Sequence, residues 1–323
     1  MKKISMLMTV MAMIAMMATG CMGGEGYEDY LGAVDKTEAI QSGASQIEVV
    51  VESTFNEAIL SELSADERKK LEQLKTYEFK LENHFNHKVD QSIYDIFYYN
   101  NNLGMDLKLY QRAEGEMFLK LPFMSAFYQV DDSFQTQGEP FDLEAFATGV
   151  NESWTAMLKS ENIFVGEKTI VKNEDGEVKA TLFSVKPTSA QLDIFMRQLR
   201  TEILDNKTVL LDAFNKLQSQ NEGAALSDED FDIIVNALFN SMVIQRYEET
   251  AYVDLDGYII DEQIIIEIEY TSNDNLNNLF KHQTITIQTK KWDIEREQEL
   301  DFSVLDSAEI LPISELEEWS VNQ

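Results

Sequence analysis

The sequence predicts an α+β fold in which antiparallel strands follow one another in runs and helices are segregated from them. The first observation is a period of two in several segments, where apolar and polar residues alternate as on a strand with one solvated face. The second is that short turns join these segments. The third is that no proline-rich, serine-rich or low-complexity linker interrupts the chain, which favours one continuous sheet over two fused halves, although both remain open.

The first run of strands follows a short helix predicted at residues 30–43. A charged helix that begins after Ser64, a suitable N-cap residue, interrupts the run and extends to Leu74. Turns rich in asparagine and glycine join the later strands into a meander. The strands predicted in this run are residues 46–55, 77–85, 91–99, 105–112 and 116–121.

The second run begins with a helix at residues 142–159, where Trp154 belongs to an apolar series spaced by four. A hairpin follows, and its Asp175-Gly176 pair predicts a type I′ turn. One or two helices are predicted at residues 188–217, and Ser227 caps another that extends to Met242. The strands predicted in this run are residues 162–172, 177–186, 244–253, 258–270, 282–292 and 295–304.

The N-terminal residues have the pattern of a bacterial lipoprotein signal peptide. Two lysines precede an uncharged run, residues 4–17, which is too short to span a membrane. The only cysteine, Cys21, follows small residues as in a lipobox, although Ala18 stands where most lipoboxes carry leucine. We therefore predict a signal peptide at residues 1–20, acylation of Cys21 and a flexible tether at residues 21–29. The alternative is an ordinary secretory signal that leaves Cys21 as a free thiol.

Charge limits the partners. The chain has 58 acidic against 26 basic residues and a formal net charge of −32. Nucleic acid is excluded because phosphate binding needs a concentrated basic face. Long-range attraction favours cationic partners, while the simpler interpretation is solubility or a salty habitat. Residues 307–323 are predicted to be an acidic C-terminal tail.

Three segments resemble a family of Gram-positive lipoproteins with the half-barrel fold of LolA, LppX and LprG. They are residues 33–37, 116–122 and 252–259, which read Ala-Val-Asp-Lys-Thr, Glu-Met-Phe-Leu-Lys-Leu-Pro and Tyr-Val-Asp-Leu-Asp-Gly-Tyr-Ile. The resemblance implies that residues 30–306 form one half-barrel, a curved antiparallel sheet with helices packed on its concave face around an apolar cavity. It also implies a lipid or other hydrophobic ligand, no catalysis, and a place on the outer face of a Gram-positive cell membrane.

Aromatic clusters supply the candidate pocket residues, with ordinary core packing as the alternative for each. One cluster surrounds residues 97–99 and another residues 123–128, and Trp154 lies on a predicted helix. The candidate pocket residues are Phe97, Tyr99, Phe118, Phe127 and Trp154.

No arrangement of residues indicates chemistry or a cofactor. His84 and His87 are three apart, a spacing that points two strand residues to opposite faces, so no metal site is predicted. Residues 252–263 resemble the middle of a calcium loop but lack the acidic residues at both ends, which favours a hairpin turn. Glycine-rich phosphate loops and a serine nucleophile elbow are absent from the sequence. We therefore predict that the protein is not an enzyme.

The leading hypothesis is a membrane-anchored binding protein for a lipid or other hydrophobic ligand. The alternative is a sensory or structural module of the cell envelope that binds another protein without a small ligand. A solute-binding protein of a transporter fits the anchor but needs strands that alternate with helices in two lobes. An enzyme is the weakest hypothesis because no catalytic site is evident.

Overall fold

The computed structural model describes residues 25–72, 75–100, 103–130, 146, 149–150, 153–154, 156–211, 215, 225–271 and 279–316. The strands are β1 (Ser42–Phe55), β2 (Thr76–Asn86), β3 (Gln91–Asn100), β4 (Leu103–Gln111), β5 (Met117–Lys120), β6 (Phe127–Val130), β7 (Ile163–Asn173), β8 (Gly176–Val185), β9 (Met242–Asp254), β10 (Ile259–Tyr270), β11 (Phe280–Trp292) and β12 (Ile310–Pro312). The helices are α2 (Glu25–Glu38), α3 (Glu57–Glu62), α4 (Ala65–Glu72), α6 (Ser189–Asp205), α8 (Asp228–Ser241) and α9 (Ser303–Asp306).

All twelve strands belong to one sheet, in the order β12-β6-β5-β4-β3-β2-β1-β11-β10-β9-β8-β7. Neighbouring strands are antiparallel except for β12 and β6, which are parallel. The two runs predicted from the sequence meet at the centre, where Val49 of β1 pairs with Ile287 of β11. The α+β prediction is confirmed.

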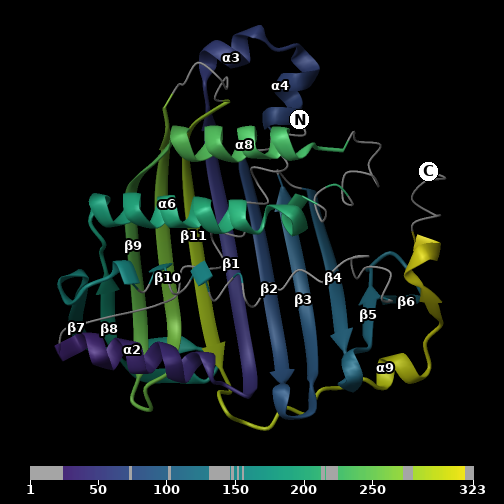
Figure 1. Cartoon of the computed structure of the whole chain (residues 1–323). Coiled ribbons are helices and arrows are strands. Elements are labelled where there is room, and N and C mark those ends of the chain that lie inside the picture. Colours follow the sequence, from purple (N-terminus) through teal and green to yellow (C-terminus); the bar gives the residue numbers. More distant parts are fainter. Residues whose placement is uncertain are drawn as a thin grey trace.

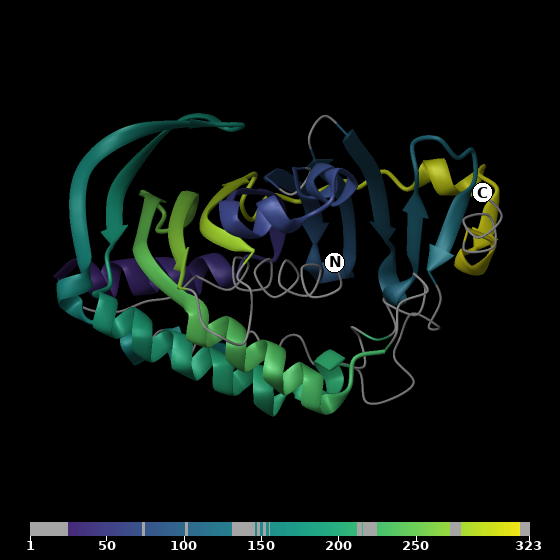
Figure 2. The ribbon, with the colours of Figure 1, turned by 90° about the horizontal axis from the view of Figure 1, so that it is seen from above.

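The sheet is curved and open, and helices cover its concave face, as predicted. Figures 1 and 2 show α6 and α8 side by side across the strands on one face, with α2 crossing the strands nearer their other ends. The period of two in the strands explains why the helices pack on this face, because alternate residues place their apolar side chains there. On β10, Ile264, Ile266 and Ile268 all face the helices and are at most 4% exposed.

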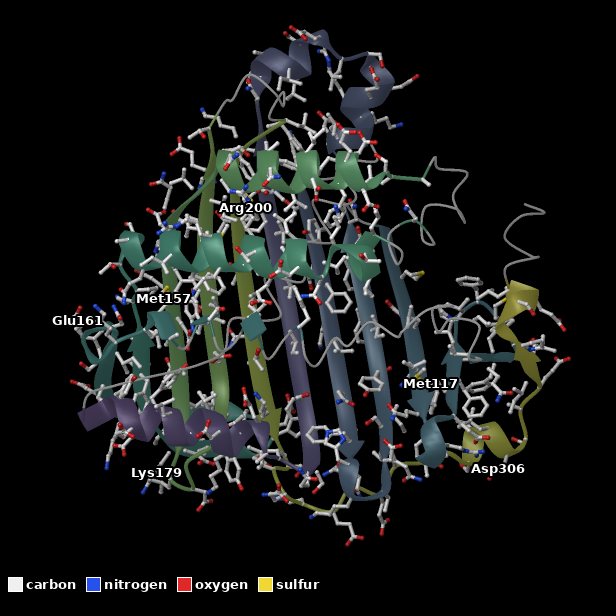
Figure 3. The ribbon with its side chains drawn as sticks, in the orientation of Figure 1. Met117, Met157, Glu161, Lys179, Arg200 and Asp306 are labelled. Carbon is white, nitrogen blue, oxygen red and sulfur yellow. The ribbon has the colours of Figure 1, made fainter. Side chains whose placement is uncertain are left out.

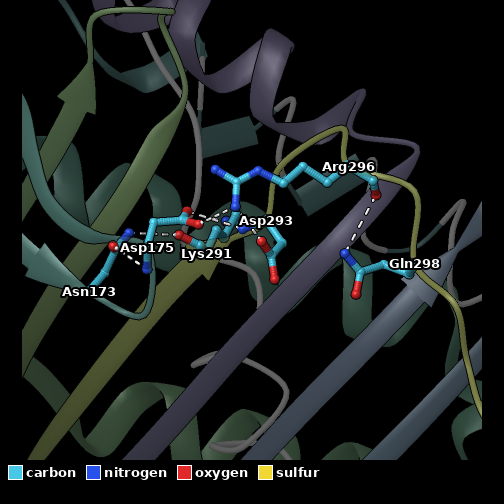
Figure 4. Close-up of polar contacts among 6 residues, drawn as sticks. All are labelled: Asn173, Asp175, Lys291, Asp293, Arg296 and Gln298. Atoms are coloured by element: carbon cyan, nitrogen blue, oxygen red, sulfur yellow. Dashed lines mark hydrogen bonds and ion pairs between the residues drawn. The ribbon is translucent and has the colours of Figure 1, made fainter.

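The hairpin of β7 and β8 extends the sheet beyond β9 and swings away from α6 and α8 (Figure 2). Its turn reaches the end of β11, where Asn173 Nδ2 donates to the Lys291 carbonyl over 3.3 Å. Asp175 accepts from Arg296 at 2.9 Å and from the Asp293 backbone N–H at 3.1 Å (Figure 4). These contacts hold the free end of the hairpin against a strand that is three positions away from β8 in the sheet.

The turn of this hairpin differs from the predicted type I′. Glu174 and Asp175 lie between the strands, but only Gly176 has a positive φ, of 100°. A type I′ turn needs positive φ at both central residues. The Asp-Gly pair therefore marks the hairpin correctly. The left-handed residue, however, is Gly176, which follows the two turn residues and begins β8.

The N-terminal helix also differs from the prediction. It begins at Glu25, inside the segment expected to be a tether, and ends at Glu38, so that residues 42–43 belong to β1. Gly26 lies in this first turn, packed against β7. A Cβ there would lie 1.8 Å from Val165 Cγ2, so glycine permits a close approach to β7 rather than supplying flexibility.

The C-terminal segments depart from the pattern as well. Residues 295–304, predicted to be a strand, contain no strand, because Asp293 and Glu295 adopt positive φ and turn the chain out of the sheet. Within the predicted acidic tail, β12 pairs with β6. Both strands are short, of three and four residues, which leaves little periodicity to detect.

Candidate functional site

An apolar cavity of about 20 Å³ lies between α6 and strands β9 and β10. This volume accommodates about one water molecule. All of its lining side chains are apolar or aromatic, and two are methionines, which adapt their shape easily. The lining residues are Trp154, Leu192, Phe195, Met196, Met242, Ile244, Tyr247, Ile266 and Ile268.

Trp154 is the largest side chain of the cavity wall and is only 1% exposed. Its ring lies 5.0 Å from that of Phe195 in an edge-on arrangement and 4.7 Å from that of Tyr247. The buried indole Nε1 has no hydrogen-bond partner among the described residues. A buried donor without a partner is uncommon and costs free energy.

A polar network fixes the start of α6 beside this cavity. Thr188 and Gln191 form a capping box, in which the Thr188 side chain accepts from the Gln191 backbone N–H. The Gln191 side chain also donates 2.8 Å bonds to the Met157 carbonyl and to Asn162 Oδ1. Met157 and Glu161 lie at this end of the sheet in Figure 3, below α6. The helix that carries Leu192 and Phe195 is thereby tied to the segment that carries Trp154.

A pair of buried carboxylates adjoins the cavity. The Tyr247 hydroxyl donates to Glu249 Oε2 over 2.7 Å, and the Tyr30 hydroxyl of α2 donates to Glu249 Oε1. Glu249 is 1% and Glu262 3% exposed, and Glu262 Oε1 has no hydrogen-bond partner within the described ranges. Tyr247 therefore belongs both to the apolar cavity and to the acid pair.

Burial alters the acidity of this pair. Removal from water is the main cause that raises the pKa of Glu249 to about 8, and repulsion from Glu262 is the second. Burial also raises the pKa of Glu262 to about 7, although the positive charge of Lys291 opposes this shift. The hydroxyl bonds from Tyr30 and Tyr247 act in the opposite direction on Glu249. Desolvation prevails, and the pair retains protons at pH values where exposed glutamates are fully ionised.

The five candidate pocket residues lie in separate places. Trp154 lines the cavity. Phe97 packs under the Lys80 ammonium group at 5.5 Å, and the Tyr99 hydroxyl lies 3.4 Å from Asp106. Phe118 and Phe127 are buried in a second cluster with Tyr110 and Leu305. That cluster is at the α9 end of the sheet, where Figure 3 shows Met117 and Asp306 far from Met157.

Sequence reasoning missed the acid pair, although a signal was present. Along β9, the residues that face the core are Tyr247, Glu249, Ala251 and Val253, so a glutamate stands in an otherwise uncharged series. Glu262 interrupts the corresponding series of isoleucines on β10 in the same way. A charged residue on the buried face of a strand is costly unless it is neutralised or paired.

The histidines and the Asp-Gly loop make structural contacts. His84 Nε2 lies 3.4 Å from Glu82, and His87 stacks on Phe85 with ring centroids 4.7 Å apart. In the β9–β10 turn, Asp254 accepts from the Tyr258 backbone N–H at 2.9 Å. Among the described residues, no three histidine, cysteine or acidic side chains are grouped closely enough to hold a metal ion.

In the part of the chain that the structure describes, no helix is long and apolar enough to cross a membrane. No protein-family profile and no curated protein sequence matches the chain. Among solved structures, it is similar to the lipoprotein LppX of Mycobacterium tuberculosis, at 8% identity and a TM-score of 0.30, over 85% of this chain and 97% of that one. It is also similar to a β-barrel-like protein of unknown function from Brucella abortus, at 8% identity and a TM-score of 0.22, over 79% of this chain and all of that one. These values carry no functional inference.

Proposed function

We propose that this protein is an extracytoplasmic lipoprotein that holds a lipid or other hydrophobic ligand between α6 and the sheet and performs no catalysis. The observation that carries the proposal is the cavity beside Trp154, whose nine lining residues present almost only apolar surface. Binding sites for small molecules are concave and predominantly apolar, as this one is. Trp154 Nε1, which has no hydrogen-bond partner among the described residues, adds a single donor for a polar atom of the ligand.

The cavity must enlarge to admit a ligand, because about 20 Å³ is room for little more than one water. Lys207, just beyond α6, forms ion pairs of 3.0 Å with Asp232 and 3.4 Å with Asp228 of α8. These contacts join the two helices to each other. A ligand larger than water therefore requires the pair of helices to separate from β9 and β10.

The anchor is part of the same proposal. Cys21 lies outside the described residues, so its acylation stays a prediction from the sequence. Three residues separate it from α2, the first described helix. Acylation there would hold the sheet close to the membrane surface, where a hydrophobic ligand can be exchanged.

Quenching of Trp154 fluorescence tests the binding site. The mature lipoprotein is titrated with a fatty acid brominated on its acyl chain, and the matched variant Trp154→Phe keeps the aromatic contact. We expect saturable quenching in the wild type and loss of most of that signal in Trp154→Phe. Of the other two tryptophans, Trp292 on β11 does not line the cavity and Trp319 lies outside the described residues. Equal quenching in both proteins, together with no lipid retained in native mass spectrometry, would contradict the proposal.

A second function, docking of another envelope protein, is favoured by the free edge of the sheet. In the part of the chain that the structure describes, β7 has no strand on its outer side, and Phe164, Val165 and Ile170 are each more than half exposed. An exposed edge strand can add a strand from another chain. Co-purification from cross-linked envelopes, compared between wild type and Ile170→Lys, tests it. Loss of a defined partner from the variant supports docking, and identical recovery contradicts it.

A further inference from the structure

The N-terminal helix α2 lies on the sheet along a single buried stripe. Gly26, Tyr30, Ala33, Val34 and Thr37 are all buried, at spacings of three, four and seven residues that place them on one helix face. Thr37 Oγ1 accepts the Ile259 backbone N–H at 2.8 Å, and the Tyr30 ring packs 5.7 Å from that of Phe183. The helix thus crosses from β8 to β10 near one end of the strands (Figure 1).

The acid pair lies directly under this helix. Glu249 on β9 pairs with Ile264 and Glu262 on β10 pairs with Ala251, so the two carboxylates are diagonal neighbours on the same face of the sheet. Tyr30 of α2 is 0% exposed and donates to Glu249. Without α2 over them, these carboxylates would be reached by water.

The groups around the pair supply little compensating positive charge. The α2 helix contributes the Tyr30 hydroxyl, β9 contributes the Tyr247 hydroxyl, and Asp261 acts on Glu262 from its own strand β10. Glu38 of α2 acts on Lys291. Lys291 on β11 is the one cation that acts on Glu262 among the described residues, and no ion pair within 4.0 Å joins them. Two buried carboxylates beside one ammonium group that forms no ion pair with them are not both readily ionised.

We propose that α2 is a proton-controlled cover, which docks over Glu249 and Glu262 while the pair retains a proton and loosens when both carboxylates are ionised. When α2 lifts, water reaches both carboxylates and stabilises their charges. Docking is then linked to proton uptake and weakens as the pH rises. The geometry sets this direction, because the covered state offers one lysine to two acids.

The cover also adjoins the proposed ligand site. Tyr247 touches the Trp154 ring on one side and Glu249 on the other. Tyr247 thus separates the cavity from Glu249. When α2 lifts, the Glu249 side of Tyr247 becomes exposed, and this gives a route to the cavity that does not pass between α6 and β9. This consequence rests on the proposed function, whereas the docking equilibrium itself needs no ligand.

Hydrogen exchange of the full mature chain in detergent micelles tests the cover. Amide exchange in α2 is measured at pH 6 and pH 9, corrected for the intrinsic effect of pH, and referred to α8 in the same molecules. We expect protection of α2 to fall at least tenfold relative to α8 on going to pH 9. The variant Glu249→Gln/Glu262→Gln should keep α2 protected at both pH values.

A matched control is Glu248→Gln, which removes a carboxylate on the neighbouring residue of β9 that pairs instead with Arg246. It should retain the wild-type response. Glu262→Gln alone provides a milder variant if the double substitution does not fold, because Glu262 Oε1 makes no hydrogen bond to any described residue. A wild-type α2 whose relative protection is the same at both pH values overturns the proposal, as does an unchanged response in the glutamine variants. Both results leave ligand binding to be judged separately by Trp154 quenching.

Discussion

Tyr247 donates a 2.7 Å hydrogen bond to Glu249 and at the same time places its ring 4.7 Å from that of Trp154. One side chain thereby connects the buried acid pair under α2 with the apolar cavity under α6. The two features lie side by side on the same face of the sheet. Changes in protonation at Glu249 and changes in packing at Trp154 are therefore expected to affect each other.

The acid pair predicts that global stability falls as the pH rises. The pKa of Glu249 is raised by burial to about 8, so the folded protein holds a proton that the unfolded chain loses near pH 4.5. The stabilisation is fully present below that lower value and is lost on going up through pH 8. Each unit of difference between the folded and unfolded pKa corresponds to about 1.36 kcal/mol, so the free energy of unfolding is expected to fall by a few kcal/mol.

Urea unfolding at pH 5, 7 and 9 measures this dependence. The variant Glu249→Gln should have a flatter profile than the wild type and should exceed it in stability at pH 9, where the native carboxylate is charged. The exposed Glu248, whose pKa Arg246 lowers, gives the comparison. If Glu249→Gln and the wild type lose stability in parallel over this range, the acid pair is not the source.

Truncation of Trp154 predicts a large loss of packing energy. Its side chain is 1% exposed and touches Phe195 and Tyr247, so Trp154→Ala should destabilise the fold by about 3 to 5 kcal/mol. Leu255→Ala, in a turn where leucine is 73% exposed, should change stability by less than about 0.5 kcal/mol. Thermal unfolding of the two variants checks the contrast, and comparable effects would show that Trp154 is not a packing centre.

The sheet could be predicted because its signal is local, whereas its pairing could not. Alternation along β2 and β10 indicates strands without reference to the rest of the chain. The central contact of β1 with β11 joins Val49 to Ile287, and only the requirement to bury both apolar faces in one layer brings these distant segments together. Gly26 illustrates a different limit. In the sequence, a glycine at this position predicts a flexible tether, whereas in the fold it allows α2 to pack closely against β7.

The site was predicted only in part for a similar reason. Helical spacing by four predicts that Trp154 lies on a buried face, and the structure places it in the cavity wall. Aromatic residues in a strand do not reveal which face is covered, and Phe97 and Phe118 lie beside Lys80 and Tyr110 rather than at the cavity. Glu249 was missed because alternate residues of β9 share one face, and the sequence alone does not show which of the two faces is buried.

The bond from Gln191 to the Met157 carbonyl predicts coupling between α6 and the Trp154 segment. Gln191 is 7% exposed and also bonds to Asn162, so Gln191→Ala leaves buried polar groups unpaired and should cost about 1 to 3 kcal/mol. The same variant should shift Trp154 emission to longer wavelength. Gln263→Ala, whose exposed side chain lies 3.3 Å from Gln288, is the control. An unaltered spectrum in Gln191→Ala would argue against this coupling.

Two glycines predict stability changes of opposite sign for the same substitution. Gly32 lies on the exposed face of α2 with nothing within 4 Å of a Cβ, so Gly32→Ala should stabilise the helix by about 0.5 to 1 kcal/mol. Gly176 has φ of 100°, which an alanine adopts only with strain, so Gly176→Ala should destabilise the hairpin by about 1 kcal/mol or more. The open space around Gly176 excludes a clash as the cause.

Hydrogen exchange locates each effect: Gly32→Ala should slow exchange in α2 alone, and Gly176→Ala should speed it in β7 and β8. Faster α2 exchange in Gly32→Ala would mean that this face of the helix is covered in solution.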